Sequence, residues 1–315
     1  MLNFKRSFTL MELSMVLAVL SLLTGIVLSG TTIINNAKAV NTIKEITTYQ
    51  EAIYKFYQTY GAIPGDYGEA QYKLSPSGYS TKSWSEIDST MISTIPHNGQ
   101  QDGKVSNRII IEDGVSYSEV FGVWNHLSSS GLIGKNFSNI CFNKSSTEIT
   151  NCAKGGYNLP IISSGLGSSS VYIFYAPDID NKDDYELIQQ LSEKNTLENS
   201  HVLLMTDISH HLTYSNTMID GSYILGGGGG INSSLMLKID LKIDDGKPLT
   251  GNVFGLNASN EDNKNNLNIK VGQCNTYKGN IYTNNGGDNS VDREKIYYTN
   301  DTEKTCLGAV LFKNF

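Results

Sequence analysis

The sequence predicts an α+β protein in which one long amino-terminal helix is followed by a β-containing globular domain with long loops. The helix is predicted because an apolar run covers residues 8–28 and apolar residues continue at helical spacing to residue 60, with no proline before Pro64. Short apolar and aromatic runs between segments rich in Asn, Ser, Thr and Gly predict the β-containing part. The net charge of −7 argues against nucleic acid or an anionic lipid surface as the partner of this domain.

The apolar run of residues 8–28 is long enough to cross a membrane. As a helix it would rise by roughly 31 Å, which is close to the thickness of the hydrocarbon core of a bilayer. Its one charged side chain is Glu12, and the basic pair Lys5 and Arg6 precedes it. A carboxylate in a membrane helix costs on the order of a few kcal/mol and usually has a partner charge. Glu12 therefore indicates a function beyond anchoring.

A partner charge for Glu12 would arise if the chain were cut after Ser7. The new amine on Phe8 would lie one helical turn from Glu12, where the Glu12 of an adjacent subunit could neutralise it. Residues 5–12, Lys-Arg-Ser-Phe-Thr-Leu-Met-Glu, resemble the class III signal of type IV prepilins and type II secretion pseudopilins. The resemblance implies a prepilin peptidase that removes the leader and N-methylates Phe8, and it makes Glu12 the assembly glutamate. Ser7 stands where such signals usually have glycine.

The amino terminus has two other interpretations. A secretory signal peptide has a shorter apolar core with a small-x-small cleavage site close behind it, whereas Ala37-Lys38-Ala39 lies many polar positions after residue 28. A simple signal anchor accounts for the length of the run and for its basic flank, which would stay cytoplasmic. It gives no reason for Glu12.

Beyond the apolar run, residues 29–60 have the pattern of an amphipathic helix laid on a globular core. Gly61 and Pro64 are expected to end it. The positions expected to face the domain are Ile33, Ala37, Val40, Ile46, Ile53 and Tyr57. Phe56-Tyr57 followed by residues 62–66 resembles the stretch after the long helix of many prepilin-type proteins. This resemblance implies a pilin-like fold with the helix as a spine.

A second helix is expected over residues 113–133, ending near Gly131. It would bury Val120, Val123, Trp124 and Leu127, and we expect His126 to be a packed, hydrogen-bonded histidine. Residues 123–134 also resemble a segment of a larger pilin-like subgroup.

The rest of the chain is expected to be strands and loops. Residues 171–176 and 201–205 predict strands, with an acidic loop at 177–184 and a short helix at 185–191 between them. The five glycines at 226–230 predict a flexible surface connection. Residues 237–243 alternate as a strand does, but the similar segment of pilin-like proteins is a short helix, so both structures remain open. Residues 257–268 and 280–292 predict loops.

Four cysteines lie in the globular part, and their even number suggests disulfides in an oxidising compartment. Three pairings are possible, of which Cys141 with Cys152 and Cys274 with Cys306 closes the shortest loops. Pilin-like domains commonly pin the carboxy-terminal segment in this way. No two cysteines have the close spacing of a structural zinc site.

Few residues suggest chemistry, and the chain is not expected to be an enzyme. Nucleophile-elbow and zinc-protease motifs are missing from the sequence, and His210-His211 near Asp207 is expected to form an exposed turn. Two acidic clusters could hold calcium, although neither has the EF-hand spacing. Some type II secretion pseudopilins bind calcium in a carboxy-terminal loop, while solvated acidic turns are the alternative. The candidate ligands are Asp178 and Asp180, with Asp183 and Asp184, and Asp240, Asp244 and Asp245.

We therefore expect a structural subunit of a type IV pilus or a type II secretion pseudopilus. Its parts would be a leader (1–7), a transmembrane helix (8–28), the amphipathic continuation (29–60) and an exported domain (61–315). The expected location is the inner membrane with the domain in the periplasm, followed by the assembled fibre. Partners would be the prepilin peptidase, other pilin or pseudopilin subunits and the inner-membrane assembly platform. The alternative is an anchored surface adhesin or binding protein that does not polymerise.

Overall fold

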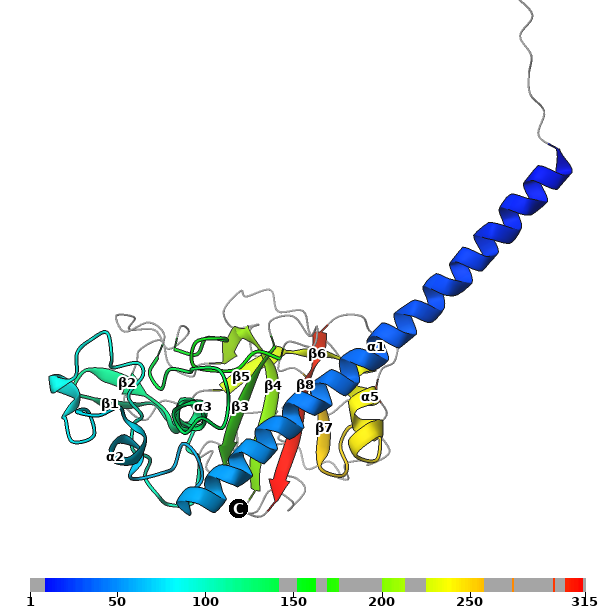
Figure 1. Cartoon of the computed structure of the whole chain (residues 1–315). Coiled ribbons are helices and arrows are strands. Elements are labelled where there is room, and N and C mark those ends of the chain that lie inside the picture. The colour runs from blue at the N-terminus through cyan, green and yellow to red at the C-terminus, as the bar shows by residue number, and fades with distance from the viewer. Residues whose placement is uncertain are drawn as a thin grey trace, which may run out of the picture.

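The longest element of the described structure is a single helix, α1 (Leu10–Tyr60). In the computed structural model its second half crosses one face of a β-sheet, while its first half projects away from the domain (Figure 1). The structure describes residues 9–141, 152–162, 169–175, 200–212, 225–257, 274, 297 and 304–313. Within them helices and sheet combine in an α+β fold, as predicted from the sequence.

The ends of α1 are fixed by local chemistry. Thr9 is its N-cap, and Gly61 ends it in the left-handed conformation at φ 68°, with the Gly61 N–H bonded to the Tyr57 carbonyl at 2.8 Å. Glycine adopts this conformation without the steric cost that a Cβ brings. The prediction of one uninterrupted helix ending at Gly61 is confirmed.

The face of α1 that packs on the domain differs in part from the prediction. Ile46 and Ile53 are buried as expected, whereas Ile33, Val40 and Tyr57 are exposed by 68, 49 and 38%. Apolar residues lie on several sides of this helix, so their spacing alone did not define which side faces the core. The observed buried stripe consists of Ala39, Thr42, Ile46, Ala52, Ile53 and Phe56.

A small lobe follows α1. It contains two short helices, α2 (Ala70–Leu74) and the 3₁₀ turn η1 (Trp84–Glu86), a hairpin of β1 (Ile110–Glu112) and β2 (Val115–Tyr117), and α3 (Glu119–Ser129).

The helix α3 is shorter than predicted. Its expected first residues form the hairpin turn instead, because Asp113 and Gly114 both have positive φ values, 49° and 76°. The four apolar side chains expected to be buried on α3 are all buried.

The main sheet has six antiparallel strands in the order β3-β4-β8-β6, with β5 paired to β4 and β7 paired to β8. The strands are β3 (Ser169–Tyr175), β4 (Ser200–Leu212), β5 (Leu225–Gly229), β6 (Ile231–Asn232), β7 (Val253–Asn257) and β8 (Lys304–Lys313). The predicted strands 171–176 and 201–205 correspond to β3 and to the first half of β4. One hydrophobic core joins the sheet, α3 and the packed face of α1.

Two predictions about the sheet were wrong. The glycine run is not a flexible connection, because Gly228 and Gly229 pair with Asp207 and Thr206 of β4. The next residue, Gly230, lies so close to β4 that a Cβ would be 2.9 Å from the Thr206 backbone. Close approach of backbones accounts for glycine here better than flexibility does. The pair His210-His211 lies within β4 and does not form a turn.

Residues 237–243, for which both strand and helix remained open, belong to helix α5 (Ser233–Ile243). This helix packs beside α1 (Figure 1). Asn232 caps it by accepting the Leu235 N–H at 2.8 Å. The predictions for residues 177–191, 258–268 and 280–292 fall outside the described residues.

Candidate functional site

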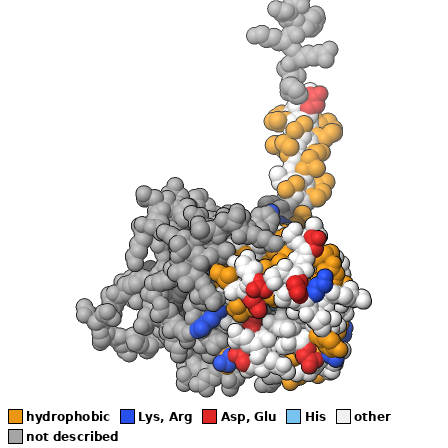
Figure 2. All heavy atoms as spheres, turned by 90° about the vertical axis from the view of Figure 1, so that its left-hand side faces the viewer, with side chains coloured by type: hydrophobic (Ala, Val, Ile, Leu, Met, Phe, Trp, Pro, Cys, Tyr) orange, Lys and Arg blue, Asp and Glu red, His pale blue; other side chains and the backbone are white. Residues whose placement is uncertain are grey.

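The projecting half of α1 is the most unusual surface of the described structure. Leu10–Val27 is apolar and long enough to cross a membrane, and none of it is buried. Apolar side chains cover this part of the helix (Figure 2). It is the one such helix among the described residues. An exposed apolar segment of this size marks a membrane or protein interaction site.

Glu12, the one charge of this segment, lies in the first turn of α1 and closes a capping box with Thr9. The Glu12 carboxylate atom Oε2 accepts the Thr9 N–H and the Thr9 hydroxyl, both at 2.9 Å. The Glu12 N–H in turn donates to the Thr9 hydroxyl at 3.2 Å. Each partner therefore satisfies a backbone N–H that the helix start would leave unpaired.

The capping box leaves room for a further partner of Glu12. Both hydrogen bonds from Thr9 go to Oε2, so the second carboxylate oxygen, Oε1, accepts no hydrogen bond from the residues that the structure describes. The candidate processing residues Ser7 and Phe8 lie outside the described residues. Sequence reasoning missed the role of Thr9, although Thr-x-x-Glu before an apolar run is a capping-box signature.

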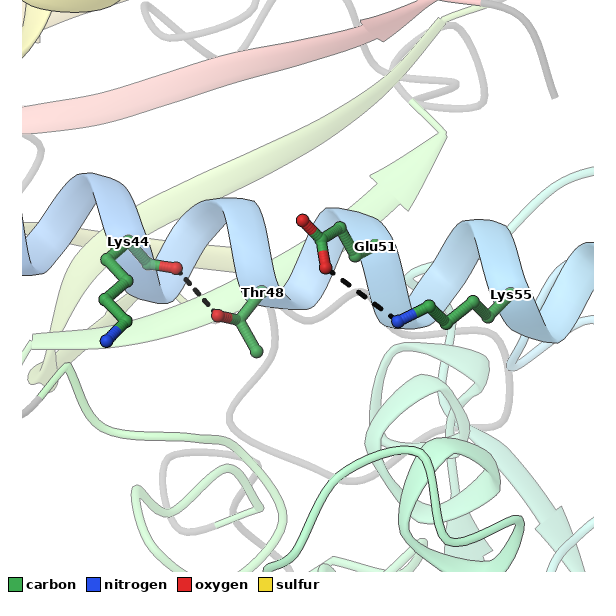
Figure 3. Close-up of polar contacts among 4 residues, drawn as sticks. All are labelled: Lys44, Thr48, Glu51 and Lys55. Atoms are coloured by element: carbon green, nitrogen blue, oxygen red, sulfur yellow. Dashed lines mark hydrogen bonds and ion pairs between the residues drawn. The ribbon is translucent and has the colours of Figure 1, made fainter.

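Farther along α1, the outer face changes from apolar to polar. Glu51 and Lys55 form an exposed ion pair with 3.8 Å between Oε2 and Nζ (Figure 3). The Thr48 hydroxyl donates to the Lys44 carbonyl at 2.8 Å on the same face (Figure 3). A pair this exposed contributes about 0–1 kcal/mol. This face therefore gives the helix solubility more than stability.

The acidic cluster predicted at Asp240, Asp244 and Asp245 does come together. One carboxylate oxygen from each of the three residues lies within 4.8 Å of the others, at the end of α5. Oxygens grouped in this way are the ligands that calcium prefers. The other candidates, Asp178 and Asp180 with Asp183 and Asp184, lie outside the described residues.

The three carboxylates also accept hydrogen bonds from the loop after α5, from the start of β7 and from Tyr297. Asp240 accepts the Tyr297 hydroxyl at 2.8 Å and the Gly246 N–H at 3.1 Å. Asp245 accepts the Lys247 N–H at 2.9 Å, and Asp244 accepts the Val253 N–H at 2.8 Å. These bonds explain the grouping as a loop closure. The cluster therefore has a structural role whether or not it binds an ion.

Burial dominates the electrostatics of this cluster. It raises the pKa of Asp240 to about 7, against the hydrogen bonds from Tyr297 and Gly246, which lower it. The pKa of the Tyr297 hydroxyl is raised as well, first by burial and then by the Asp240 charge. A buried acid that holds its proton near neutrality is a weaker metal ligand than an ionised one.

His126 is packed and hydrogen bonded, as predicted. Its Nδ1 accepts the Gly65 N–H at 2.9 Å, and its Nε2 bonds the His97 carbonyl at 2.8 Å. His97 itself is stacked between the rings of Trp84 and Tyr117, at centroid distances of 3.3 and 3.6 Å. Burial lowers the pKa of both histidines, for His126 to about 4. Both are therefore neutral, and His126 ties α3 to the turn at Gly65 and to the backbone at His97.

The four cysteines form the two short-loop disulfides, Cys141 with Cys152 and Cys274 with Cys306. All four are buried. Cys306 lies in β8 opposite Ile231 of β6 and Asn257 of β7, so the second disulfide fixes the meeting point of three strands.

Comparison of the chain with protein-family models, with curated proteins and with solved structures found no match. The fold and the site define the class of an α+β protein with an exposed apolar amino-terminal helix and two disulfides.

Proposed function

We propose that the chain is a pilin-like structural subunit that is anchored in the inner membrane by α1 and polymerises through that helix into a type IV pilus or a type II secretion pseudopilus. The observation that carries the proposal is the projecting half of α1, which is apolar, unburied and interrupted by a single acid in its first turn. The helix continues without a break into the core of the domain, so a force on the anchor acts directly on the domain.

The role of Glu12 in this proposal is to set the axial register between subunits. Removal of residues 1–7 by a prepilin peptidase would place a cationic amine on Phe8, and Oε1 of a neighbouring Glu12 would accept it. Thr9 would hold the carboxylate in place through Oε2. A charge pair formed within apolar surroundings repays part of the cost of each buried charge.

The alternative function is a membrane-anchored adhesin or binding protein that does not polymerise. Such a protein needs the apolar length of α1, and the charge of an acid within it makes insertion less favourable. The capping box with Thr9 does not require that charge, because an uncharged glutamine closes the same box. The presence of Glu12 favours the polymerising subunit.

The test is the substitution Glu12→Ala in the full-length chain, with Glu51→Ala as the matched control. Both remove one exposed acid from α1, but Glu51 lies outside the apolar segment and contacts Lys55. We expect Glu12→Ala to leave membrane insertion intact and to reduce fibres in the sheared fraction at least tenfold, while Glu51→Ala assembles normally. Wild-type fibre yield from Glu12→Ala would disprove the pairing and favour the non-polymerising anchor.

A further inference from the structure

Two residues near the start of α1, Ser7 and Thr9, are of the type that begins helices. The structure begins α1 at the second of them. Thr9 has an extended backbone, at φ −81° and ψ 150°, and Leu10 is the first helical residue. The Leu13 N–H donates to the Thr9 carbonyl at 3.2 Å, as expected for a helix that starts there. The helix therefore begins after the proposed processing site and not at it.

The Thr9 side chain sets this start by taking an N–H group that a longer helix would use. If α1 continued toward the amino terminus, the Glu12 N–H would donate to the Phe8 carbonyl. It donates to the Thr9 hydroxyl at 3.2 Å. The Glu12 carboxylate accepts the Thr9 N–H at 2.9 Å, so this N–H is also satisfied without another turn of helix.

A lipid environment favours a longer helix than the one observed. The apolar run begins at Phe8, and backbone groups in lipid must find their hydrogen bonds within the chain, which favours helix over the whole run. Without the Thr9 hydroxyl, Ser7 is the nearest residue that can cap the helix. A helix capped by Ser7 would include Phe8, and its first bond would join the Met11 N–H to the Ser7 carbonyl.

We propose that Thr9 is a positioning residue for processing, because its capping box starts α1 at Leu10 and thereby keeps the Ser7–Phe8 amide outside the helix, where a prepilin peptidase can bind it. The inference rests on the proposed function, which supplies this cut. Hydrolysis adds one water to the amide and leaves a carboxylate on Ser7 and an ammonium group on Phe8. The peptidase must donate hydrogen bonds to the Ser7 carbonyl oxygen as negative charge develops there. In a helix capped by Ser7, that oxygen would already be bonded to Met11.

The capping box gives Glu12 a role in processing that differs from its role in assembly. Glutamine closes a capping box as well as glutamate does, so the helix start needs the side chain of residue 12 but not its charge. Pairing with the amine of a neighbouring subunit needs the charge. Glu12→Gln should therefore be processed at the wild-type rate and still assemble poorly.

The test is the rate at which a purified prepilin peptidase cuts the full-length precursor in detergent. Thr9→Val is the informative variant, because valine has the branched shape and nearly the helix propensity of threonine but cannot cap. Loss of a cap of this kind should slow the cut about fivefold. Thr9→Ser and Thr9→Asn, which can cap, should be cut at the wild-type rate. Thr9 is exposed and lies outside the core, so none of these changes removes a core contact of the domain.

Trypsin provides a second measurement that does not involve the prepilin peptidase. It cuts after Arg6 and must bind Ser7 and Phe8 in an extended conformation to do so. If Thr9→Val extends the helix to Ser7, tryptic cleavage after Arg6 should slow by a similar factor. Cleavage after the exposed Lys82 in the small lobe serves as the internal reference and should not change.

Three results would overturn the proposal. The first is cutting of Thr9→Val by the prepilin peptidase at the wild-type rate. The second is slower cutting by the peptidase with unchanged tryptic cleavage, which would show that the peptidase recognises the Thr9 hydroxyl directly. The third is Thr9→Asn processed as slowly as Thr9→Val. If the peptidase does not cut the wild type before Phe8, the proposed function fails, and the tryptic comparison still decides whether Thr9 sets the helix start.

Discussion

At the scale of single residues, Thr9 gives Glu12 a local role that does not require another subunit. The capping box between them satisfies N–H groups at the start of α1, and a threonine cap of this kind contributes about 1 kcal/mol. The same contacts provide two donors to a carboxylate that lies within an apolar segment. Glu12 is therefore already oriented before a neighbouring amine could reach it.

Ser7 allows a test of the proposed processing site. Under the proposed function we expect the mature chain to begin with N-methylated Phe8, because residues 5–12 resemble the prepilin signal apart from Ser7. Ser7→Gly should be processed at least as well as the wild type, whereas Ser7→Leu should accumulate precursor because a bulky side chain precedes the cut. Mass spectrometry of the purified amino terminus measures both. A mature start at Met1 or near Asn41, or normal processing of Ser7→Leu, would contradict the proposed site.

Some residue-level features could be predicted from the sequence because their causes are local. Gly61 stands where the apolar pattern of α1 stops, and glycine commonly ends helices. His126 lies next to Trp124 on a helix, where a histidine is normally packed. The hydrogen bonds that Glu119 and Asp66 accept from residues 100–106 could not be predicted in the same way. Glu119 and Asp66 are separated by more than fifty positions in the sequence, and only the packing of α3 on the turn at Gly65 brings both beneath that segment.

At the scale of elements, length was easier to predict than orientation. The 51 residues of α1 contain no proline, so helical spacing sufficed to predict one helix. The buried side of α1 is decided by its contacts with α5 and the sheet. The spacing of apolar residues along the helix does not predict these contacts. The strand β5 was not predicted for the same reason. Its glycines have a low strand propensity, and they form a strand because they pair with β4.

The disulfide between Cys274 and Cys306 should contribute more stability than the one between Cys141 and Cys152. It spans 32 residues instead of 11, and chain entropy predicts about 3–4 kcal/mol for the longer loop and about 1 kcal/mol less for the shorter one. Replacing Cys274 and Cys306 together with Ser should therefore lower the melting temperature more than replacing Cys141 and Cys152. Thermal unfolding of both double variants provides the comparison. Equal melting temperatures would show that loop length does not govern this stabilisation.

At the scale of the whole molecule, buried ionisable groups of two kinds limit stability from both sides of neutrality. Burial lowers the pKa of His126 and His201 to about 4, so protonation of the unfolded chain below about pH 6.5 favours unfolding. Burial raises the pKa of Glu119 to about 8 and of Asp240 to about 7, so ionisation above about pH 4.5 favours unfolding increasingly until pH 8. The two trends oppose each other near pH 6.

We therefore predict that the melting temperature is highest near pH 6 and falls by several degrees toward both pH 4 and pH 8.5. Asp240→Asn should flatten the alkaline decline, since the amide can still accept the Tyr297 hydroxyl. His126→Gln should flatten the acid decline, since its amide can replace one ring contact. Scanning calorimetry across this range measures both slopes. A melting temperature that rises steadily from pH 4 to pH 8.5 would contradict the assignment of Glu119 and Asp240 as buried acids.

The position of β8 has a consequence for how this protein can be made. β8 follows every other described strand in the sequence, yet it lies inside the sheet and pairs with β4, β6 and β7. Those strands can meet only when residues 304–313 have arrived, so the sheet assembles from contacts that are distant along the chain, and folding of this kind is slow. A chain that is still being synthesised would therefore have α1 complete well before β8 could join β4 to β6 and β7.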